Sequence, residues 1–139
     1  MDILYIDDDA DDIESFLEAL QRTEHAVKFS YALSANDALK KLNNYLAKPD
    51  VIFVDYRLGA IDGYECVRRI REREELKNIP VVVLSGNISP AIVDEFNKIG
   101  VYHFLSKTAI LTDMQAALKV LLDGFSKTEK NRTGLDTVL

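Results

Sequence analysis

Short apolar runs alternate with longer amphipathic stretches along most of the chain. The first run, residues 3–6, is rich in strand-forming residues, and apolar residues then recur at helical spacing over residues 9–22. This alternation occurs five times. The expected strands are residues 3–6, 27–33, 50–56, 79–86 and 101–106, and the expected helices are residues 9–22, 34–46, 62–72, 89–100 and 111–125.

The strict alternation of strands and helices predicts an α/β fold with a doubly wound parallel sheet and helices on both faces. The runs 50–56 and 79–86 are continuously apolar, which is typical of strands covered on both sides. Residues 126–139 are polar and aperiodic. We therefore expect one domain over residues 1–125, followed by a polar tail or the start of a linker.

Composition narrows the class of protein. The 139 residues carry a formal net charge of −6, which argues against a nucleic-acid partner because such proteins usually show a basic surface. No apolar run approaches the roughly 18 residues that span a bilayer, and no signal peptide opens the chain. The single cysteine, Cys66, has no partner for an internal disulfide. These features predict a cytoplasmic protein without a membrane segment.

Polar side chains follow several of the expected strands, where the sites of doubly wound sheets lie. They are Asp7, Asp8 and Asp9 after the first strand, Ser34 after the second, Asp55 after the third, Ser85 after the fourth and Lys107 after the fifth. Clustered carboxylates suit a hard divalent cation, Mg²⁺ above all, and the absence of a Cys/His cluster disfavours zinc. A cation beside a lysine favours a phosphoryl group, which an aspartate can accept as a nucleophile.

These residues resemble the receiver domain of two-component response regulators over about residues 2–125. The matching features are the acid pair Asp7–Asp8 in "YIDDD", Asp55 in "VDYRLGAIDG" with Asp62–Gly63 after it, Ser85 in "VVVLSG" and Lys107 in "GVYHFLSK". The separations of 30 residues from Asp55 to Ser85 and 22 from Ser85 to Lys107 fit the family pattern. The resemblance implies a flavodoxin-like (βα)5 fold with the strand order 2-1-3-4-5.

The resemblance also implies a phosphoacceptor and a metal site. Asp55 would accept the phosphoryl group. Asp8 and Asp55 would bind Mg²⁺ directly, together with the backbone carbonyl of Arg57, and Asp7 would act largely through water. A histidine kinase or a histidine phosphotransfer protein would supply the phosphoryl group, so the donor histidine would lie on another protein.

Three further residues would complete the switch by the same resemblance. Lys107 would pair with the Asp55 carboxylate and then with the phosphoryl group, and Ser85 would hydrogen-bond a phosphoryl oxygen. Phe104 would be the switch aromatic, whose rotamer follows Ser85. The face formed by the fourth helix, fifth strand and fifth helix would then signal to a downstream protein, as a monomer or a weak phosphorylation-dependent dimer.

The sequence departs from the family pattern at three positions. Gly59 stands where many receivers have proline, which predicts a more flexible loop. Thr108 follows Lys107 in place of the usual proline, so we expect either a trans bond with a reshaped loop or a rare strained cis bond. Phe104 lacks the hydroxyl of the commoner tyrosine. Arg57 and Asn87 occupy positions where family members tune dephosphorylation.

Two other functions remain open at this point. A phosphatase of the haloacid-dehalogenase type would use Asp7 as the nucleophile and Asp9 as a second acid, but it leaves Asp55 without a role. It also needs a further acidic pair, for which the chain offers only Asp113 and Asp123. A receiver that binds its partners without phosphorylation is the other alternative. The chain would be either a stand-alone regulator or a receiver cut from a longer protein.

The acidic run after the first strand also has a simpler interpretation. Negative side chains at the start of a helix are stabilised by the helix dipole, and this explains Asp9, Asp11 and Asp12. It explains Asp7 and Asp8 less well, because those residues end the strand.

Overall fold

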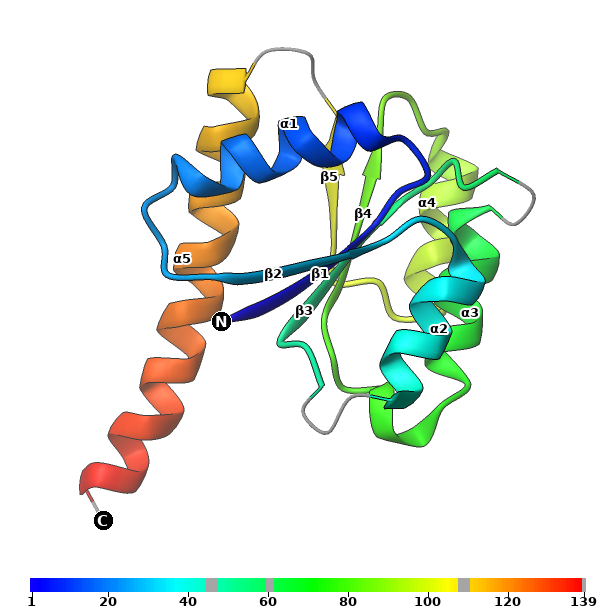
Figure 1. Cartoon of the computed structure of the whole chain (residues 1–139). Coiled ribbons are helices and arrows are strands. Elements are labelled where there is room, and N and C mark those ends of the chain that lie inside the picture. The colour runs from blue at the N-terminus through cyan, green and yellow to red at the C-terminus, as the bar shows by residue number, and fades with distance from the viewer. Residues whose placement is uncertain (45–47, 60–61, 108–110, 139) are drawn as a thin grey trace. The chain divides into compact units, whose positions relative to one another are not determined.

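In the computed structural model, which describes residues 1–44, 48–59, 62–107 and 111–138, five strands alternate with five α-helices (Figure 1). The strands are β1 (Asp2–Ile6), β2 (Lys28–Ala32), β3 (Val51–Asp55), β4 (Val81–Ser85) and β5 (His103–Ser106). The helices are α1 (Ala10–Gln21), α2 (Ala35–Asn44), α3 (Gly63–Arg71), α4 (Pro90–Lys98) and α5 (Leu111–Val138). A short 3-10 helix, η1 (Glu74–Leu76), was not expected from the sequence.

The strands form one parallel sheet in the order β2-β1-β3-β4-β5, so the predicted fold and strand order are confirmed. Every residue of β3 and β4 is buried, as their continuous apolar runs predict. β2 lies at the edge, where Lys28 and Tyr31 are exposed. The centre of the sheet is therefore its most apolar part, and the carboxyl ends of all five strands meet at one rim.

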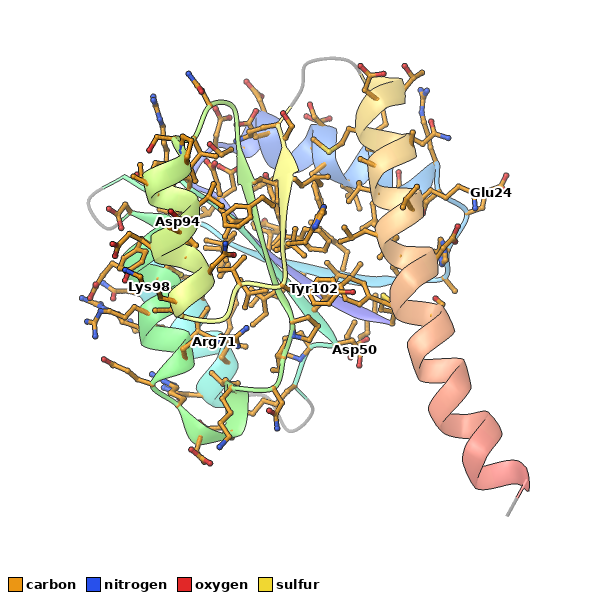
Figure 2. All side chains as sticks on the ribbon, turned by 180° about the vertical axis from the view of Figure 1, so that it is seen from behind. Glu24, Asp50, Arg71, Asp94, Lys98 and Tyr102 are labelled. Atoms are coloured by element: carbon orange, nitrogen blue, oxygen red, sulfur yellow. The ribbon has the colours of Figure 1, made fainter. Side chains whose placement is uncertain are left out.

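One face of the sheet packs on α2, α3 and α4. Ile52 of β3 and Val83 of β4 belong to a hydrophobic core to which each of these helices contributes, with Leu42, Ile70 and Phe96 as fully buried members. The opposite face carries Ile3, Tyr5 and Phe53, which are buried as well. The outer side of α4 is polar, with Asp94 and Lys98 exposed (Figure 2). The helical spacing of apolar residues thus predicted the buried faces.

Serine side chains cap the N-termini of α2 and α4. The Ser34 hydroxyl accepts a hydrogen bond from the Asp37 backbone N–H at 3.0 Å, and the Ser89 hydroxyl accepts one from the Ile92 N–H at 3.3 Å. Pro90 occupies the first turn of α4, and Gly100 follows that helix with a φ of +79°. The predicted start and stop of this helix are therefore confirmed.

The chain divides into two compact units, one of residues 1–14 and 26–107 and the other of residues 15–25 and 108–139. In the second unit, His25 Nε2 lies 2.7 Å from Asp123 Oδ1, and Lys119 Nζ lies 3.1 Å from Asp123 Oδ2. The Gln115 side-chain amide donates to the Arg22 carbonyl at 3.1 Å. These contacts join the end of α1 and the turn after it to α5.

The predicted end of the fifth helix at about Phe125 is wrong, because α5 continues to Val138. Extending an existing helix costs far less than starting one, so a polar segment can remain helical without an apolar stripe that would reveal it. None of the described helices has both the length and the apolar character needed to cross a membrane. The last two residues of the expected helix 34–46 and the Lys107–Thr108 bond lie outside the described residues.

The close approach of α3 to the end of β3 depends on Gly63. Its backbone N–H donates to the Tyr56 carbonyl at 2.7 Å, and a Cβ at this position would lie 2.6 Å from the Asp55 carbonyl oxygen and 2.8 Å from the Tyr56 Cα. Both neighbours are backbone atoms, so they cannot rotate away. Any side chain here must displace the end of the strand that carries Asp55.

We expect Gly63→Ala to lower the free energy of unfolding by about 1–3 kcal/mol because of this overlap. Gly124→Ala is the control, since its Cβ would meet no described atom within 4 Å. Alanine in the interior of α5 should stabilise by up to about 1 kcal/mol. Urea unfolding of both variants measures the two effects, and a stabilised Gly63→Ala protein would contradict the packing.

Candidate functional site

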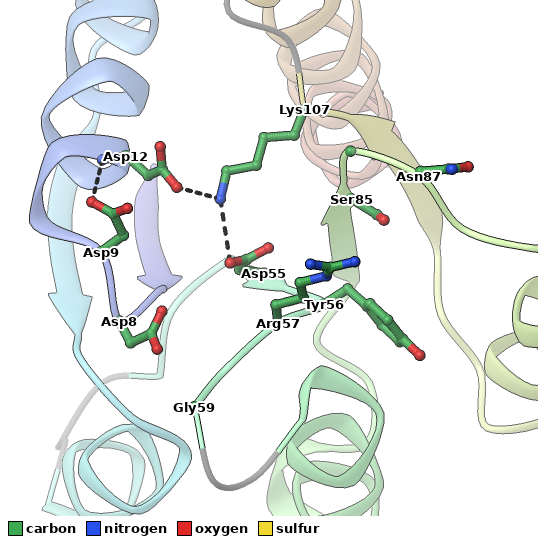
Figure 3. A pocket seen from close by; sticks show the side chains of 11 residues that line it. Asp8, Asp9, Asp12, Asp55, Tyr56, Arg57, Gly59, Ser85, Asn87 and Lys107 are labelled. Carbon is green, nitrogen blue, oxygen red and sulfur yellow. Dashed lines mark hydrogen bonds and ion pairs between the residues drawn. The ribbon is translucent and has the colours of Figure 1, made fainter.

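The rim of the sheet carries a pocket to which loops from four strands contribute (Figure 3). Asp55 ends β3, Ser85 ends β4, and Lys107 directly follows β5. The residues lining the pocket are Asp8, Asp9, Asp12, Asp55, Tyr56, Arg57, Gly59, Ser85, Gly86, Asn87 and Lys107. Distant parts of the sequence therefore meet here, as the parallel topology requires.

Three carboxylates form the acidic part of the site. One oxygen each from Asp7, Asp8 and Asp55 lies within 4.8 Å of the other two. Asp7 is fully buried and Asp55 nearly so, whereas Asp8 is exposed. Oxygen ligands without histidine or cysteine match the preference of hard divalent cations. The predicted acid pair and the predicted third-strand aspartate thus form a cluster that could bind a metal ion.

The ammonium group of Lys107 lies among these carboxylates. Its Nζ is 2.6 Å from Asp12 Oδ2, 3.1 Å from Asp7 Oδ2 and 3.2 Å from Asp55 Oδ2, and Figure 3 shows the contacts with Asp12 and Asp55. Burial disfavours the charge of Lys107, but the hydrogen bonds to Asp12 and Asp7 and the charges of Asp7 and Asp55 outweigh it. Together they raise the Lys107 pKa above its ordinary value. The lysine is therefore protonated at neutral pH.

Asp7 is held from two further sides. The Tyr5 hydroxyl donates to Asp7 Oδ2 at 2.6 Å, and the Asp9 backbone N–H donates to Asp7 Oδ1 at 3.0 Å. Burial and then the Asp7 carboxylate raise the Tyr5 pKa, so the phenol keeps its proton. Sequence reasoning missed Tyr5. The available signal was a tyrosine inside a buried strand, where its hydroxyl needs a partner.

The electrostatics of Asp55 reflect competing influences. Burial and the neighbouring Asp7 charge raise its pKa, whereas Lys107 and the Arg57 backbone N–H lower it. The net direction is upward from the ordinary value. Keeping this carboxylate ionised therefore costs free energy, and that cost is smallest when a positive partner is present.

The two predicted switch residues, Ser85 and Phe104, lie in different surroundings. Ser85 lines the pocket, as do Arg57 and Asn87, which the family resemblance connects with the tuning of dephosphorylation. Phe104 does not line it. Its ring packs edge-on against Phe96, with centroids 5.7 Å apart, and it belongs to the periphery of the hydrophobic core.

The backbone conformation at residue 59 explains why glycine stands there in place of the family's common proline. Gly59 has a φ of +52°, which proline cannot adopt because its ring fixes φ near −65°. A Cβ here would lie 3.3 Å from Asp8 Oδ2. The glycine therefore allows the loop after β3 to approach the acid pair. Thr108, the second departure, lies outside the part of the chain that the structure describes.

The helix-start interpretation holds for Asp9 but is incomplete for Asp12. Asp9 Oδ1 accepts hydrogen bonds from the backbone N–H groups of Asp11 at 2.9 Å and Asp12 at 3.3 Å, which satisfies the start of α1. Asp12 instead places its carboxylate in the pocket, next to Lys107. The sequence held one clue, because Asp12 stands three residues after Asp9, which is close to one helical turn and returns its side chain toward the rim.

Comparison with known proteins agrees with this arrangement. The family model described as the response regulator receiver domain matches residues 3–119. The two-component response regulator ARR5 of Arabidopsis thaliana is 31% identical over 140 residues, covering 93% of this chain and 74% of that protein. These matches give no support to the phosphatase alternative.

Three further proteins show the range of the likeness. The peroxide stress-activated histidine kinase mak3 of Schizosaccharomyces pombe is 32% identical over 81 residues, covering 53% of this chain but only 4% of that protein. Another curated relative is matched over 41% of its length, so the chain spans less than half of these two relatives. The crystal structure of the phosphorylated cyanobacterial phytochrome response regulator RcpA has a TM-score of 0.81 and 26% identity, covering 91% of this chain and 94% of that one.

The raised pKa of Asp55 predicts a pH-dependent stability. Since the folded pKa lies above the unfolded one, the folded state keeps its proton to higher pH, and stability falls as the pH rises between the two values. Without divalent cations, Asp55→Asn should therefore raise the free energy of unfolding at neutral pH, by on the order of 1 kcal/mol. This gain should shrink as the pH falls toward the unfolded-state pKa of about 3.9.

Chemical unfolding at a series of pH values measures this difference. Asp94→Asn is the control, because it removes the same charge from an exposed position on α4. An Asp55→Asn protein that is less stable than wild type at neutral pH would contradict the raised pKa.

Proposed function

The chain belongs to the response regulator receiver-domain family, and on this basis we propose that it is a signalling switch driven by phosphorylation of Asp55. The observation that carries the proposal is the meeting of Asp55 with Lys107, Asp7 and Asp8 at the rim of the sheet. The solved receiver RcpA, which is 26% identical, is named as a phosphorylated protein. The protein would act as a phosphoacceptor domain and would catalyse only its own phosphorylation and dephosphorylation.

The acidic cluster fits Mg²⁺ by its chemistry, because its donors are carboxylate oxygens only. Asp8, Asp55 and the Arg57 carbonyl would hold the ion, and Asp7 would act largely through water, since Tyr5, Asp9 and Lys107 already occupy its oxygens. When bound, Mg²⁺ neutralises negative charge on the carboxylates and on the incoming phosphoryl oxygens.

In the proposed reaction, an Asp55 carboxylate oxygen attacks the phosphorus atom of a phosphohistidine. A new P–O bond forms and the P–N bond breaks, and the electron pair stays on the histidine nitrogen, which takes up a proton. Lys107 lies 3.2 Å from Asp55 and is protonated at neutral pH, so it would orient the nucleophile and then pair with the phosphoryl group. The product is an acyl phosphate on Asp55.

Ser85 at the end of β4 would bind the phosphoryl group. Its hydroxyl lines the pocket and would donate a hydrogen bond to a phosphoryl oxygen. Movement of Ser85 would allow Phe104 to change its packing against Phe96, and so bias α4 and β5. Because Phe104 has no hydroxyl, the contact that it offers a downstream protein would be apolar.

The remaining expectations stay part of the proposal. The phosphoryl donor would be a histidine kinase or a histidine phosphotransfer protein, in keeping with a relative that is named a histidine kinase. The output would be contact with a downstream protein in the cytoplasm, without direct binding of nucleic acid or membrane. The receiver domain would cover residues 1–125, and residues 126–139 would form a tail or linker, in which α5 continues to Val138.

Intact mass after incubation with a small acyl phosphate tests the proposal. We expect one phosphoryl adduct on the wild-type protein with Mg²⁺, none with EDTA, and none on Asp55→Asn with Mg²⁺. Asp94→Asn should behave as wild type, because that exposed residue lies on the polar side of α4.

Two outcomes would contradict the proposal. If no adduct forms under any condition, the phosphorylation switch is wrong and a phosphorylation-independent binding function replaces it. If an adduct persists in Asp55→Asn but disappears in Asp7→Asn, Asp7 is the nucleophile and the protein is a phosphatase.

A further inference from the structure

Asp12 is the carboxylate nearest to the lysine of the site, yet the proposed mechanism gives it no role. Its Oδ2 lies 2.6 Å from Lys107 Nζ, closer than the oxygens of Asp7 and Asp55 at 3.1 and 3.2 Å. The contact joins the first turn of α1 to the end of β5. Asp9 already satisfies the backbone at the start of this helix, so helix capping does not account for the position of Asp12.

An ammonium group has three protons to donate. Lys107 contacts three carboxylates, so each of its three N–H donors already has an acceptor before any phosphoryl group arrives. A phosphoryl oxygen can gain a hydrogen bond from Lys107 only if one of the three carboxylates loses its own. The carboxylate that loses its hydrogen bond to Lys107 should be the one whose charge is best compensated by other contacts or by water.

Asp7 and Asp55 are poor candidates to give up the lysine. Asp7 is fully buried and held by the Tyr5 hydroxyl and the Asp9 N–H, so losing Lys107 would leave a buried charge with less compensation. Asp55 is the acceptor, and it needs its contact with Lys107 until its oxygen attacks the phosphorus atom. The Asp12 side chain is 38% exposed, so water can replace the lysine at little cost.

We propose that Asp12 competes with the phosphoryl group for Lys107, and thereby limits both the rate at which Asp55 is phosphorylated and the lifetime of the acyl phosphate. The inference rests on the proposed phosphorylation of Asp55. Phosphorylation also replaces a single negative charge by about two, close to the Asp12 carboxylate that lines the same pocket. Competition of Asp12 for Lys107 and repulsion between Asp12 and the phosphoryl group both destabilise the phosphorylated state.

The test compares Asp12→Asn with Asp11→Asn. Both variants remove one negative charge from adjacent positions in the first turn of α1, but the half-buried Asp12 lines the pocket and the exposed Asp11 does not. With Mg²⁺ and a small acyl phosphate, Asp12→Asn should be phosphorylated faster and hydrolysed more slowly than wild type, by up to about fivefold in each rate. Asp11→Asn should stay close to wild type in both.

A second measurement does not depend on catalysis. Beryllofluoride imitates a phosphoryl group on an aspartate, and its affinity in the presence of Mg²⁺ can be measured by calorimetry. Asp12→Asn should bind it up to about fivefold more tightly than wild type and Asp11→Asn. Circular dichroism verifies that both variants are folded.

Three results would overturn the inference while leaving the proposed function intact. Rates and affinity of Asp12→Asn equal to wild type would show that Asp12 does not restrain Lys107. An equal gain in Asp11→Asn would assign the effect to net charge and not to the contact. A slower, weaker Asp12→Asn protein would show that Asp12 positions the lysine for the reaction. If instead the wild-type protein forms no adduct at all, the proposed function fails, and the inference fails with it.

Discussion

The ammonium group of Lys107 offsets the repulsion among carboxylates that the fold places together. Asp7 follows β1, Asp55 ends β3, and parallel pairing of the two strands fixes them at the same rim. Two negative charges in a largely buried site repel strongly, because little water is present to screen them. The Lys107 ammonium group lies within 3.2 Å of both the Asp7 and the Asp55 carboxylates. Its positive charge therefore allows both carboxylates to remain at the buried end of the sheet.

Lys107 compensates the charge of the carboxylates only in part, and this agrees with the proposed function. The Asp55 pKa remains raised, which means that burial and Asp7 outweigh Lys107. A buried site whose negative charges are not fully compensated destabilises the folded protein relative to an apolar site of the same size. Binding of a cation would therefore stabilise such a site. Tyr5 keeps Asp7 in place without adding charge, since its hydroxyl remains protonated. The lower stability of the rim is what the proposed binding of a metal ion and a phosphoryl group would require.

Much of the fold and of the site could be predicted from the sequence, for identifiable reasons. The parallel sheet and the rim acids follow from apolar runs such as 50–56 and from residues at strand ends, which depend on local pattern and parallel topology, whereas the strand order is implied by the family resemblance. The contacts of Tyr5 and Asp12 depend on where side chains from separate elements meet, and no periodic pattern encodes that. The extension of α5 to Val138 escaped prediction because a polar helix carries no apolar stripe.

The most direct test of the acidic cluster as a cation site is the free energy of unfolding as a function of Mg²⁺ concentration. A ligand that binds only the folded state stabilises it, by about 2.7 kcal/mol at a hundred times the dissociation constant. We expect saturable stabilisation of the wild-type protein beyond that given by NaCl of equal ionic strength. Asp8→Asn should lose most of it, because Asp8 is an exposed member of the cluster whose replacement leaves the core intact. Equal stabilisation of both proteins, or none beyond that of NaCl, would contradict a metal site formed by these carboxylates.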